Sequence, residues 1–149
     1  MNTGRDLVEV VEDALVLDKY VERVADPRAG AVSTFSGVTR NHFQGKRVEK
    51  LEYEAYVPMA IKVMRDICEE ARSKWDLIQC AIAHRTGTVH VGQPSVVIAV
   101  SSAHRKGAMD ATAYIIDEIK ARAPIWKKEF YQDGSVWKEN QEGKLVREK

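Results

Sequence analysis

Several features that mark common enzyme and membrane-protein classes are scarce or missing in this chain. It has 2 cysteines, Cys68 and Cys80, and no Cys-x-x-Cys spacing for metal binding or disulfide exchange. Its longest apolar run, Val96–Val100, is far too short to cross a bilayer. There is also no Gly-x-Gly-x-x-Gly, phosphate-loop or Gly-x-Ser-x-Gly motif, so the nucleotide sites and the hydrolase centre that these motifs mark are not expected.

The histidines and cysteines form no pattern that would bind a metal. The 4 histidines show no metal-ligand spacing; they are His42, His84, His90 and His104. Cys68 lies on an apolar stripe at helical spacing, and Cys80 alternates with apolar residues as in a strand, so both thiols are predicted to be buried in the core. We therefore expect neither a metal nor another cofactor.

Composition and charge indicate a single globular domain over residues 1–149. Hydrophobic residues make up 44% of the chain and charged residues 30%, which is typical of a folded protein with a real core. The net charge of +1 gives no global reason to expect a nucleic-acid partner. Residues 1–6 lack the apolar core of a secretion signal, which favours the cytoplasm and no membrane attachment.

Hydrophobic periodicity predicts an alternation of strands and helices. Strands are predicted near 7–11, 31–38, 48–56, 78–85, 96–102, 129–131 and 136–137, and helices near 18–25, 58–75 and 106–123. We expect Asp18 to cap the first helix, Pro58 to lie in the first turn of the second, and the strands 31–38 and 48–56 to form a hairpin. His84 ends a strand and is interpreted as a hydrogen-bonding residue there. The polar tail 138–149 is expected to be flexible.

The cations gather in three segments that could bind an anion. The first is the loop 39–47, which carries Arg40, His42, Lys46 and Arg47. The second is 101–105, Ser-Ser-Ala-His-Arg, where a buried strand meets a helix start. The third is 120–128, and each segment also fits a plain structural role: a solvated loop, a capped helix start and a solvated helix end.

The segment 120–128 has the most informative arrangement. Pro124 removes a backbone donor and biases Ala123 away from helical angles, so the helix carrying Lys120 should end there, with Lys127 past the break. Two like charges held at a bend beside Trp126 are costly to keep ionised, which suits an acid–base group or an anion clamp.

One helix is predicted to carry both Arg105 and Lys120. Fifteen positions on a helix correspond to roughly 22 Å, so the two side chains cannot grip one small ligand within a single copy. Either they serve different sites, or a symmetric dimer brings Arg105 of one subunit toward Lys120 of the other, which we favour.

Four motifs resemble the large, catalytic subunit family of molybdopterin synthase. They occur in family order within about 31–137, at 33–42 (STFSGVTRNH), 51–56 (LEYEAY), 101–105 (SSAHR) and 120–129 (KARAPIWKKE). The resemblance implies an α+β, hammerhead-like single domain with an antiparallel or mixed sheet, two main helices and a small additional β subdomain. It further implies a homodimer within a heterotetramer, with a small ubiquitin-like sulfur-carrier subunit docked at each end.

The resemblance also implies the reaction and its residues. Two sulfur atoms would pass from the C-terminal thiocarboxylate of the carrier to cyclic pyranopterin monophosphate, forming the dithiolene of molybdopterin. Lys120 would be the foremost catalytic residue with Lys127 as its partner, and Arg40, His104, Arg105 and Lys127 would bind the pterin phosphate.

Two further expectations stay open once the resemblance is considered. The strands around 129–137 could form one wall of a groove for the carrier tail. The alternative function is a non-catalytic binding module for a ubiquitin-like tail or an anionic, nucleotide-like ligand.

Overall fold

The computed structural model describes residues 6–139 and 145–148, and within them the chain forms three helices and ten strands in two sheets. The helices are α1 (Leu17–Val24), α2 (Val57–Lys74) and α3 (Arg105–Arg122). The strands are β1 (Asp6–Val11), β2 (Ala31–Val38), β3 (His42–Phe43), β4 (Lys46–Ala55), β5 (Leu77–Arg85), β6 (Gly87–His90), β7 (Pro94–Ser102), β8 (Ile125–Tyr131), β9 (Val136–Glu139) and β10 (Leu145–Glu148). The predicted α+β class is confirmed.

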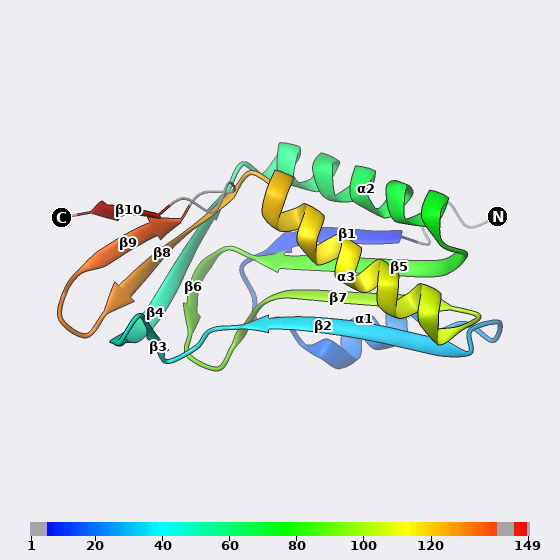
Figure 1. Ribbon diagram of the computed structural model, residues 1–149, viewed down its shortest axis with the longest axis horizontal. Coiled ribbons are helices and arrows are strands. Elements are labelled where there is room, and N and C mark those ends of the chain that lie inside the picture. The colour runs from blue at the N-terminus through cyan, green and yellow to red at the C-terminus, as the bar shows by residue number, and fades with distance from the viewer. Residues whose placement is uncertain (1–5, 140–144, 149) are drawn as a thin grey trace.

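The first sheet is covered by helices on both faces. Its strand order is β1-β5-β7-β2, with β1 parallel to β5 and the other pairs antiparallel. Figure 1 shows α2 and α3 over one face and α1 against the other. Because successive side chains alternate between faces, Ile82 and Ile98 pack under α2 and α3, whereas Ala83 and Val97 pack against α1. Because helices cover both faces of this sheet, the sequence of β7 contains a continuous apolar run.

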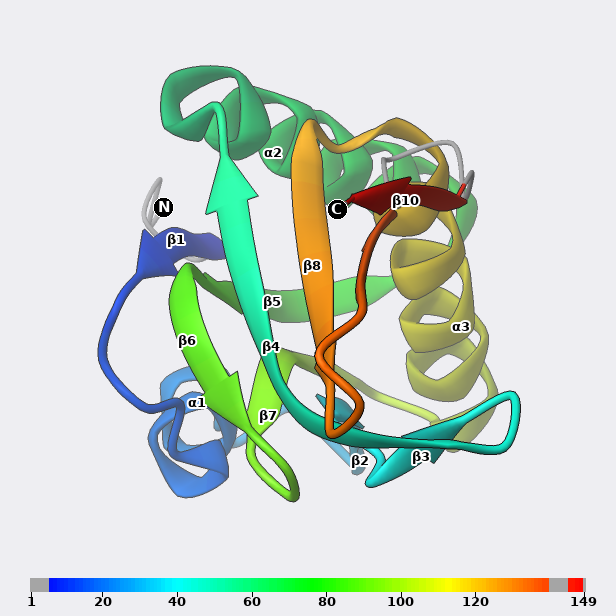
Figure 2. The ribbon, with the colours of Figure 1, turned by 90° about the vertical axis from the view of Figure 1, so that its left-hand side faces the viewer.

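The second sheet is antiparallel and stands beside the first. Its order is β10-β9-β8-β4-β3, with β6 also paired to β4 (Figure 2). The two-residue turn between β3 and β4 places Gln44 and Gly45 at positive φ, 51° and 78°, which is the geometry that matches the twist of a tight hairpin. Val48, Leu51 and Tyr131 form a small core of this sheet.

The chain crosses from the helical layer to the second sheet at Pro124. Helix α3 ends at Arg122, and β8 begins at Ile125, so the predicted break is confirmed. The carbonyl of Pro124 accepts a hydrogen bond of 3.1 Å from the amide of Tyr56, just before α2. This bond fixes the crossing against the start of a second helix, in which Pro58 lies in the first turn as predicted.

Other local predictions differ from the structure. The predicted hairpin of 31–38 with 48–56 is wrong, because β2 pairs with β7 in the first sheet while β4 pairs with β3, β6 and β8 in the second. Asp18 lies in the first turn of α1 and Val16 is its N-cap. Where a flexible tail was expected from 138, the structure has β9 and β10, and residues 140–144 and 149 lie outside the described residues.

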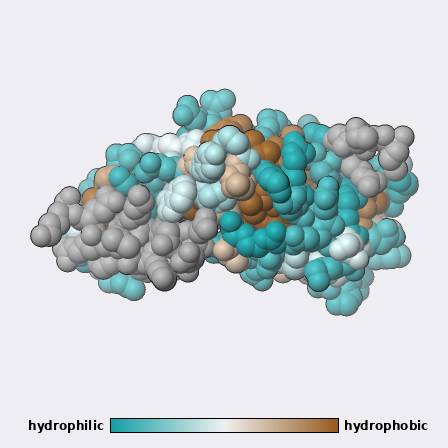
Figure 3. Space-filling view, turned by 90° about the horizontal axis from the view of Figure 1, so that it is seen from above, coloured by the Kyte–Doolittle hydropathy of each residue, from teal (hydrophilic) through white to brown (hydrophobic). Residues whose placement is uncertain are grey.

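The remaining burial pattern separates core from surface. Cys68 and Cys80 are both buried, which confirms the prediction of buried thiols. Hydrogen bonding with Cys80, together with burial, raises the pKa of Cys68. Met109 is 60% exposed, because α3 packs through Ala108, Ala111 and Ile115. Viewed from above, apolar side chains gather near the middle of the surface, with hydrophilic ones around them (Figure 3).

Among the described residues, no helix is long and apolar enough to cross a membrane.

Candidate active site

A cavity of about 380 Å³ lies where the end of α3 and strand β8 face the ends of the first sheet. Its apolar walls come from both layers and include Phe35, Val96, Ile116, Ile119 and Ile125. The polar lining comes from several elements and consists of Thr39, Arg40, His42, Tyr53, His84, Ser95, Lys120, Lys127 and Glu129. The cavity therefore combines apolar walls with a polar lining that includes three Lys and Arg side chains and one carboxylate.

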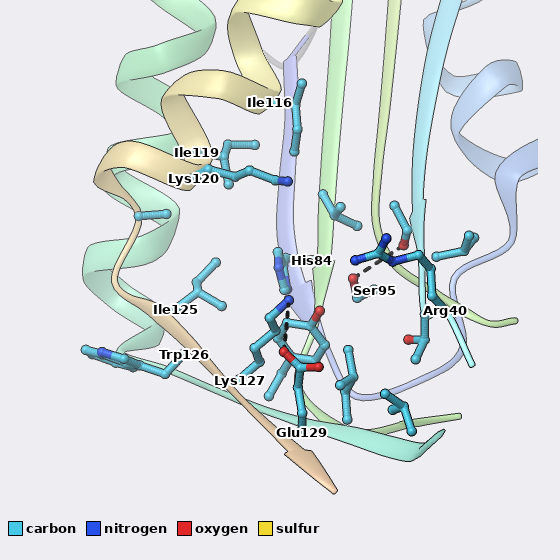
Figure 4. Close-up of a pocket in the computed structure, with 18 of the residues that line it drawn as sticks. Arg40, His84, Ser95, Ile116, Ile119, Lys120, Ile125, Trp126, Lys127 and Glu129 are labelled. Atoms are coloured by element: carbon cyan, nitrogen blue, oxygen red, sulfur yellow. Dashed lines mark hydrogen bonds and ion pairs between the residues drawn. The ribbon is translucent and has the colours of Figure 1, made fainter. Parts of the chain in front are cut away.

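Three of the predicted site residues meet in this cavity. Lys120 comes from the last turn of α3, Lys127 from β8 and Arg40 from the segment that follows β2 (Figure 4). The bend at Pro124 makes this possible, since it turns the chain so that residues before and after it face one space. Cations at fixed positions in a partly enclosed site stabilise anionic ligands and developing negative charge without reorganising.

Strand β8 presents alternate side chains to the cavity. Lys127 and Glu129 are two residues apart and both line the cavity. Trp126 also contributes to the lining, but its indole points away from the labelled cations in Figure 4. The expected desolvation of the lysines by the Trp126 indole therefore has no support in this geometry. The Lys127 Nζ lies 3.8 Å from Glu129 Oε2, and Glu129 is only 5% exposed. The buried carboxylate thus partly balances the cationic wall, and it accepts a 3.3 Å hydrogen bond from the Tyr131 hydroxyl.

The predicted basic loop divides between two roles. Arg40 and His42 line the cavity, and the Arg40 guanidinium carbon lies 5.9 Å from the centre of the Phe43 ring, within range of a cation–π contact. Lys46 points elsewhere, with its Nζ 3.3 Å from a carboxylate oxygen of Asp133 in the β8–β9 turn. The first two residues therefore belong to the site, whereas Lys46 pairs with the turn between β8 and β9.

His104 and Arg105 lie outside the cavity, at the opposite end of α3. Both are exposed, and Arg105 begins the same helix that carries Lys120 near its end, which confirms the predicted separation along one helix. The neighbouring serines have structural partners: Ser102 donates to the Asp76 carbonyl at 2.8 Å, and Ser101 accepts from the Gln79 amide at 3.1 Å. His104 is the N-cap of α3 and no side chain makes a capping hydrogen bond there, so the capped helix start considered for this segment is wrong.

His84 is the cavity residue that sequence reasoning missed. Its side chain was expected to make a hydrogen bond at a strand end, and its Nδ1 indeed lies 2.9 Å from the Arg85 carbonyl oxygen. Its ring also contacts Tyr53 edge-on, with centroids 5.1 Å apart. Burial lowers the pKa of His84 to about 4, with the hydrogen bond to Arg85 acting weakly in the opposite direction. No local sequence pattern marks His84 as a cavity residue, because the second sheet that encloses it is built from segments that are distant in the sequence.

The described part of the chain offers little to a metal ion. No three His, Cys, Asp or Glu side chains come together there as a candidate ligand set. One further polar group stands out in the lining: Thr39 is buried, and its hydroxyl has no hydrogen-bond partner among the described residues. A buried hydroxyl without a partner costs free energy, so this group is available for a hydrogen bond to a ligand.

Comparisons with known proteins agree with this fold. A family model described as MoaE protein matches residues 10–122. The chain is 53% identical to the molybdopterin synthase catalytic subunit of Arabidopsis thaliana over 140 residues, which are 93% of this chain and 71% of that protein. It is 47% identical to the human protein of the same name over 139 residues, 93% of this chain and 74% of that protein.

A solved structure supports the same assignment. The crystal structure of molybdopterin synthase from Staphylococcus aureus matches with a TM-score of 0.81 at 42% identity, over 85% of this chain and 92% of that chain. The chain therefore belongs to the MoaE protein family, which confirms the resemblance found in its four motifs.

Proposed function

We propose that this chain acts as the catalytic subunit of a molybdopterin synthase. Its reaction is the transfer of sulfur from the C-terminal thiocarboxylate of a small ubiquitin-like carrier to cyclic pyranopterin monophosphate, which forms the dithiolene of molybdopterin. The observation that carries the proposal is the convergence of Arg40, Lys120 and Lys127, from three separate elements, on one cavity with apolar walls. The family membership and the names of its relatives support it.

The chemistry of the cavity suits both reactants. The substrate phosphate and the incoming thiocarboxylate are anions, and the fixed cations stabilise them and any further charge that develops during transfer. The apolar walls suit the flat face of a pterin. Lys120 is the proposed catalytic residue, with Lys127 as its partner and as a substrate ligand beside Arg40. The sulfur comes from the carrier, so the buried Cys68 and Cys80 need no chemical role.

His104 and Arg105 enter the proposal through a second copy of the chain. Their distance from the cavity along α3 leaves them unable to reach a ligand held by Lys120 of the same subunit. In a homodimer with two-fold symmetry, the α3 start of each subunit would complete the cavity of the other and bind the substrate phosphate. Two carrier subunits on this dimer give a heterotetramer.

The carrier tail would reach the cavity as an extended segment. Strand β8 lines the cavity and is followed by β9, so this hairpin is the proposed wall of the tail groove. The side chain of Trp137, on β9, is not among those that the structure describes. A pull-down in which Trp137→Ala binds the carrier as tightly as the wild type would count against this wall.

Reconstitution tests the enzymatic proposal directly. Purified protein, thiocarboxylated carrier and cyclic pyranopterin monophosphate are mixed, and the dithiolene product is measured by fluorescence after oxidation. The proposal predicts product with the wild type and a strong loss with Lys120→Ala, while carrier binding remains. A folded wild type that binds the carrier but yields no dithiolene would instead show a non-catalytic binding module.

A further inference from the structure

The floor of the cavity contains a buried imidazole among cations. His84 lies at the end of β5, is 6% exposed and lines the same cavity as Lys120 and Lys127. In the view of Figure 4, its ring projects between the ammonium groups of these two lysines. A buried polar side chain that lines a cavity is expected to have hydrogen-bond partners for all of its polar atoms.

One nitrogen of this ring is committed to the backbone. The Arg85 carbonyl oxygen only accepts hydrogen bonds, so Nδ1, 2.9 Å away, must carry the proton and donate it. In the neutral ring this leaves Nε2 with a lone pair. Within the described part of the chain, Nε2 has no hydrogen-bond partner, since the other contact of the ring is the edge-on packing against Tyr53.

The surroundings keep this lone pair available at neutral pH. Burial lowers the pKa of His84 to about 4, and a third positive charge beside two ammonium groups would be costly. A base this weak is poorly matched to proton abstraction near pH 7. The ring is better suited to accept a hydrogen bond than to remove a proton.

His84 Nε2, as a hydrogen-bond acceptor, and the lysines, as cations, contact different parts of a ligand. Phosphate and thiocarboxylate oxygens have lone pairs of their own, so they are drawn to Lys120 and Lys127 and repelled by Nε2. A pterin, in contrast, carries amino and ring N–H donors at the edge of its heterocycle. A buried acceptor that meets such a donor discriminates strongly against analogues that lack it.

We propose that His84 Nε2 accepts a hydrogen bond from an N–H of the substrate heterocycle and thereby determines specificity for a pterin over other phosphorylated compounds. This role rests on the proposed function, since it assigns a part of the same substrate. It divides the cavity into a cationic region for the charged groups and a neutral acceptor for the ring.

Two amide variants of His84 separate hydrogen-bond acceptance by Nε2 from the structural hydrogen bond that Nδ1 donates to Arg85. In His84→Asn, the amide nitrogen can replace Nδ1 as the donor to Arg85, but no atom replaces Nε2. In His84→Gln, the longer side chain can place its amide oxygen near the position of Nε2. His90→Asn is the matched control, because His90 is exposed on β6 and does not line the cavity.

Calorimetric titration with three probes then tests the proposal. The probes are cyclic pyranopterin monophosphate, an unphosphorylated pterin and inorganic phosphate. We expect His84→Asn to weaken binding of both pterins by roughly tenfold, as for the loss of one hydrogen bond, and to leave phosphate binding unchanged. His84→Gln should recover most of the affinity, and His90→Asn should match the wild type. Equal pterin affinity in wild type and His84→Asn, or an equal loss for phosphate, would overturn the proposal.

A measurement on the wild type covers the case in which the variants fail to fold. Nitrogen-15 NMR of the imidazole reports which ring nitrogen carries the proton and whether the other accepts a hydrogen bond. The proposal predicts a protonated Nδ1, and an Nε2 resonance that shifts when the unphosphorylated pterin is added. An unchanged Nε2 resonance at saturation would contradict it. Neither readout needs turnover, so a failure of the sulfur-transfer proposal in the reconstituted assay stays distinguishable from a failure of this one.

Discussion

The two ends of α3 carry similar basic side chains in different surroundings. Lys120, in the last turn, faces a cavity closed by β8 and the second sheet, whereas Arg105, at the first residue, is exposed and faces no such layer within one subunit. A basic helix end thus becomes part of a site only where a second structural layer meets it. After the end of α3, the chain bends at Pro124 and continues as β8 of the second sheet. This strand brings Lys127 to the same cavity as Lys120.

The largest expected effect is at the cavity end of α3. Lys120→Ala should lower turnover in the reconstituted assay by about 10²- to 10³-fold, the usual loss on removing one fixed charge from a site that stabilises an anionic transition state. Carrier binding should remain, as measured by pull-down. Lys62→Ala is the control, since Lys62 is an exposed cation on α2, outside the cavity lining, with an ion pair to Asp66 at 3.0 Å. Wild-type turnover in Lys120→Ala would overturn the catalytic assignment.

The buried imidazole at the cavity end should also make stability depend on pH. The pKa of His84 is lowered from 6.5 to about 4 in the folded protein, so the unfolded chain binds more protons between these values. The contribution of neutral His84 to the free energy of unfolding is therefore fully present above pH 6.5. It is lost as the pH falls toward 4, and the loss amounts to about 3 kcal/mol. Urea unfolding at pH 7, 5.5 and 4.5 should show a smaller loss in His84→Asn than in the wild type. Identical pH dependence in both proteins would contradict the buried, neutral state.

A smaller effect is expected at the open end of α3. Arg105→Ala should raise the KM for the pterin phosphate by roughly tenfold or more, since it removes one charge-assisted contact to the phosphate, and should change kcat less. Steady-state kinetics with varied pterin concentration measures the two constants separately. A KM equal to that of the wild type would remove Arg105 from the substrate site and leave the two ends of α3 unrelated.

The smallest effect is expected from the buried hydroxyl in the cavity lining. Thr39→Val replaces a hydroxyl that has no partner among the described residues with a methyl group of similar size. The free energy of unfolding without ligand should stay equal or rise by about 1 kcal/mol, as measured by urea unfolding. Clear destabilisation would show that the hydroxyl has a partner in the folded protein.

Local sequence signals predicted the parts of the site that depend on neighbouring residues. Pro124 and the apolar stripe before it were enough to predict the end of α3 and the position of Lys120 and Lys127 on either side of the bend. The buried thiols followed from helical and strand periodicity in the same way. These features depend on interactions within a few residues, so a single sequence carries them.

Strand pairing was the part that local signals did not determine. The segments 31–38 and 48–56 read as a hairpin because they are adjacent in sequence, yet β2 pairs with β7 and β4 with β8, many residues away. The choice of partner depends on the burial of whole sheet faces rather than on a turn. His84 was missed for the same reason, since the cavity around it forms only when β4 and β8 pair and face the end of β5.

Subunit mixing tests most directly whether the two ends of α3 form one site. Differently tagged Lys120→Ala and Arg105→Ala proteins are mixed and allowed to exchange subunits, with exchange verified by capture through both tags. The dithiolene product is then measured at a pterin concentration well below the wild-type KM, where the raised KM leaves Arg105→Ala with little activity of its own. In a shared site, each mixed dimer keeps one intact cavity, so random exchange should restore about a quarter of wild-type activity. Captured mixed dimers with no more activity than the separate variants would contradict the account.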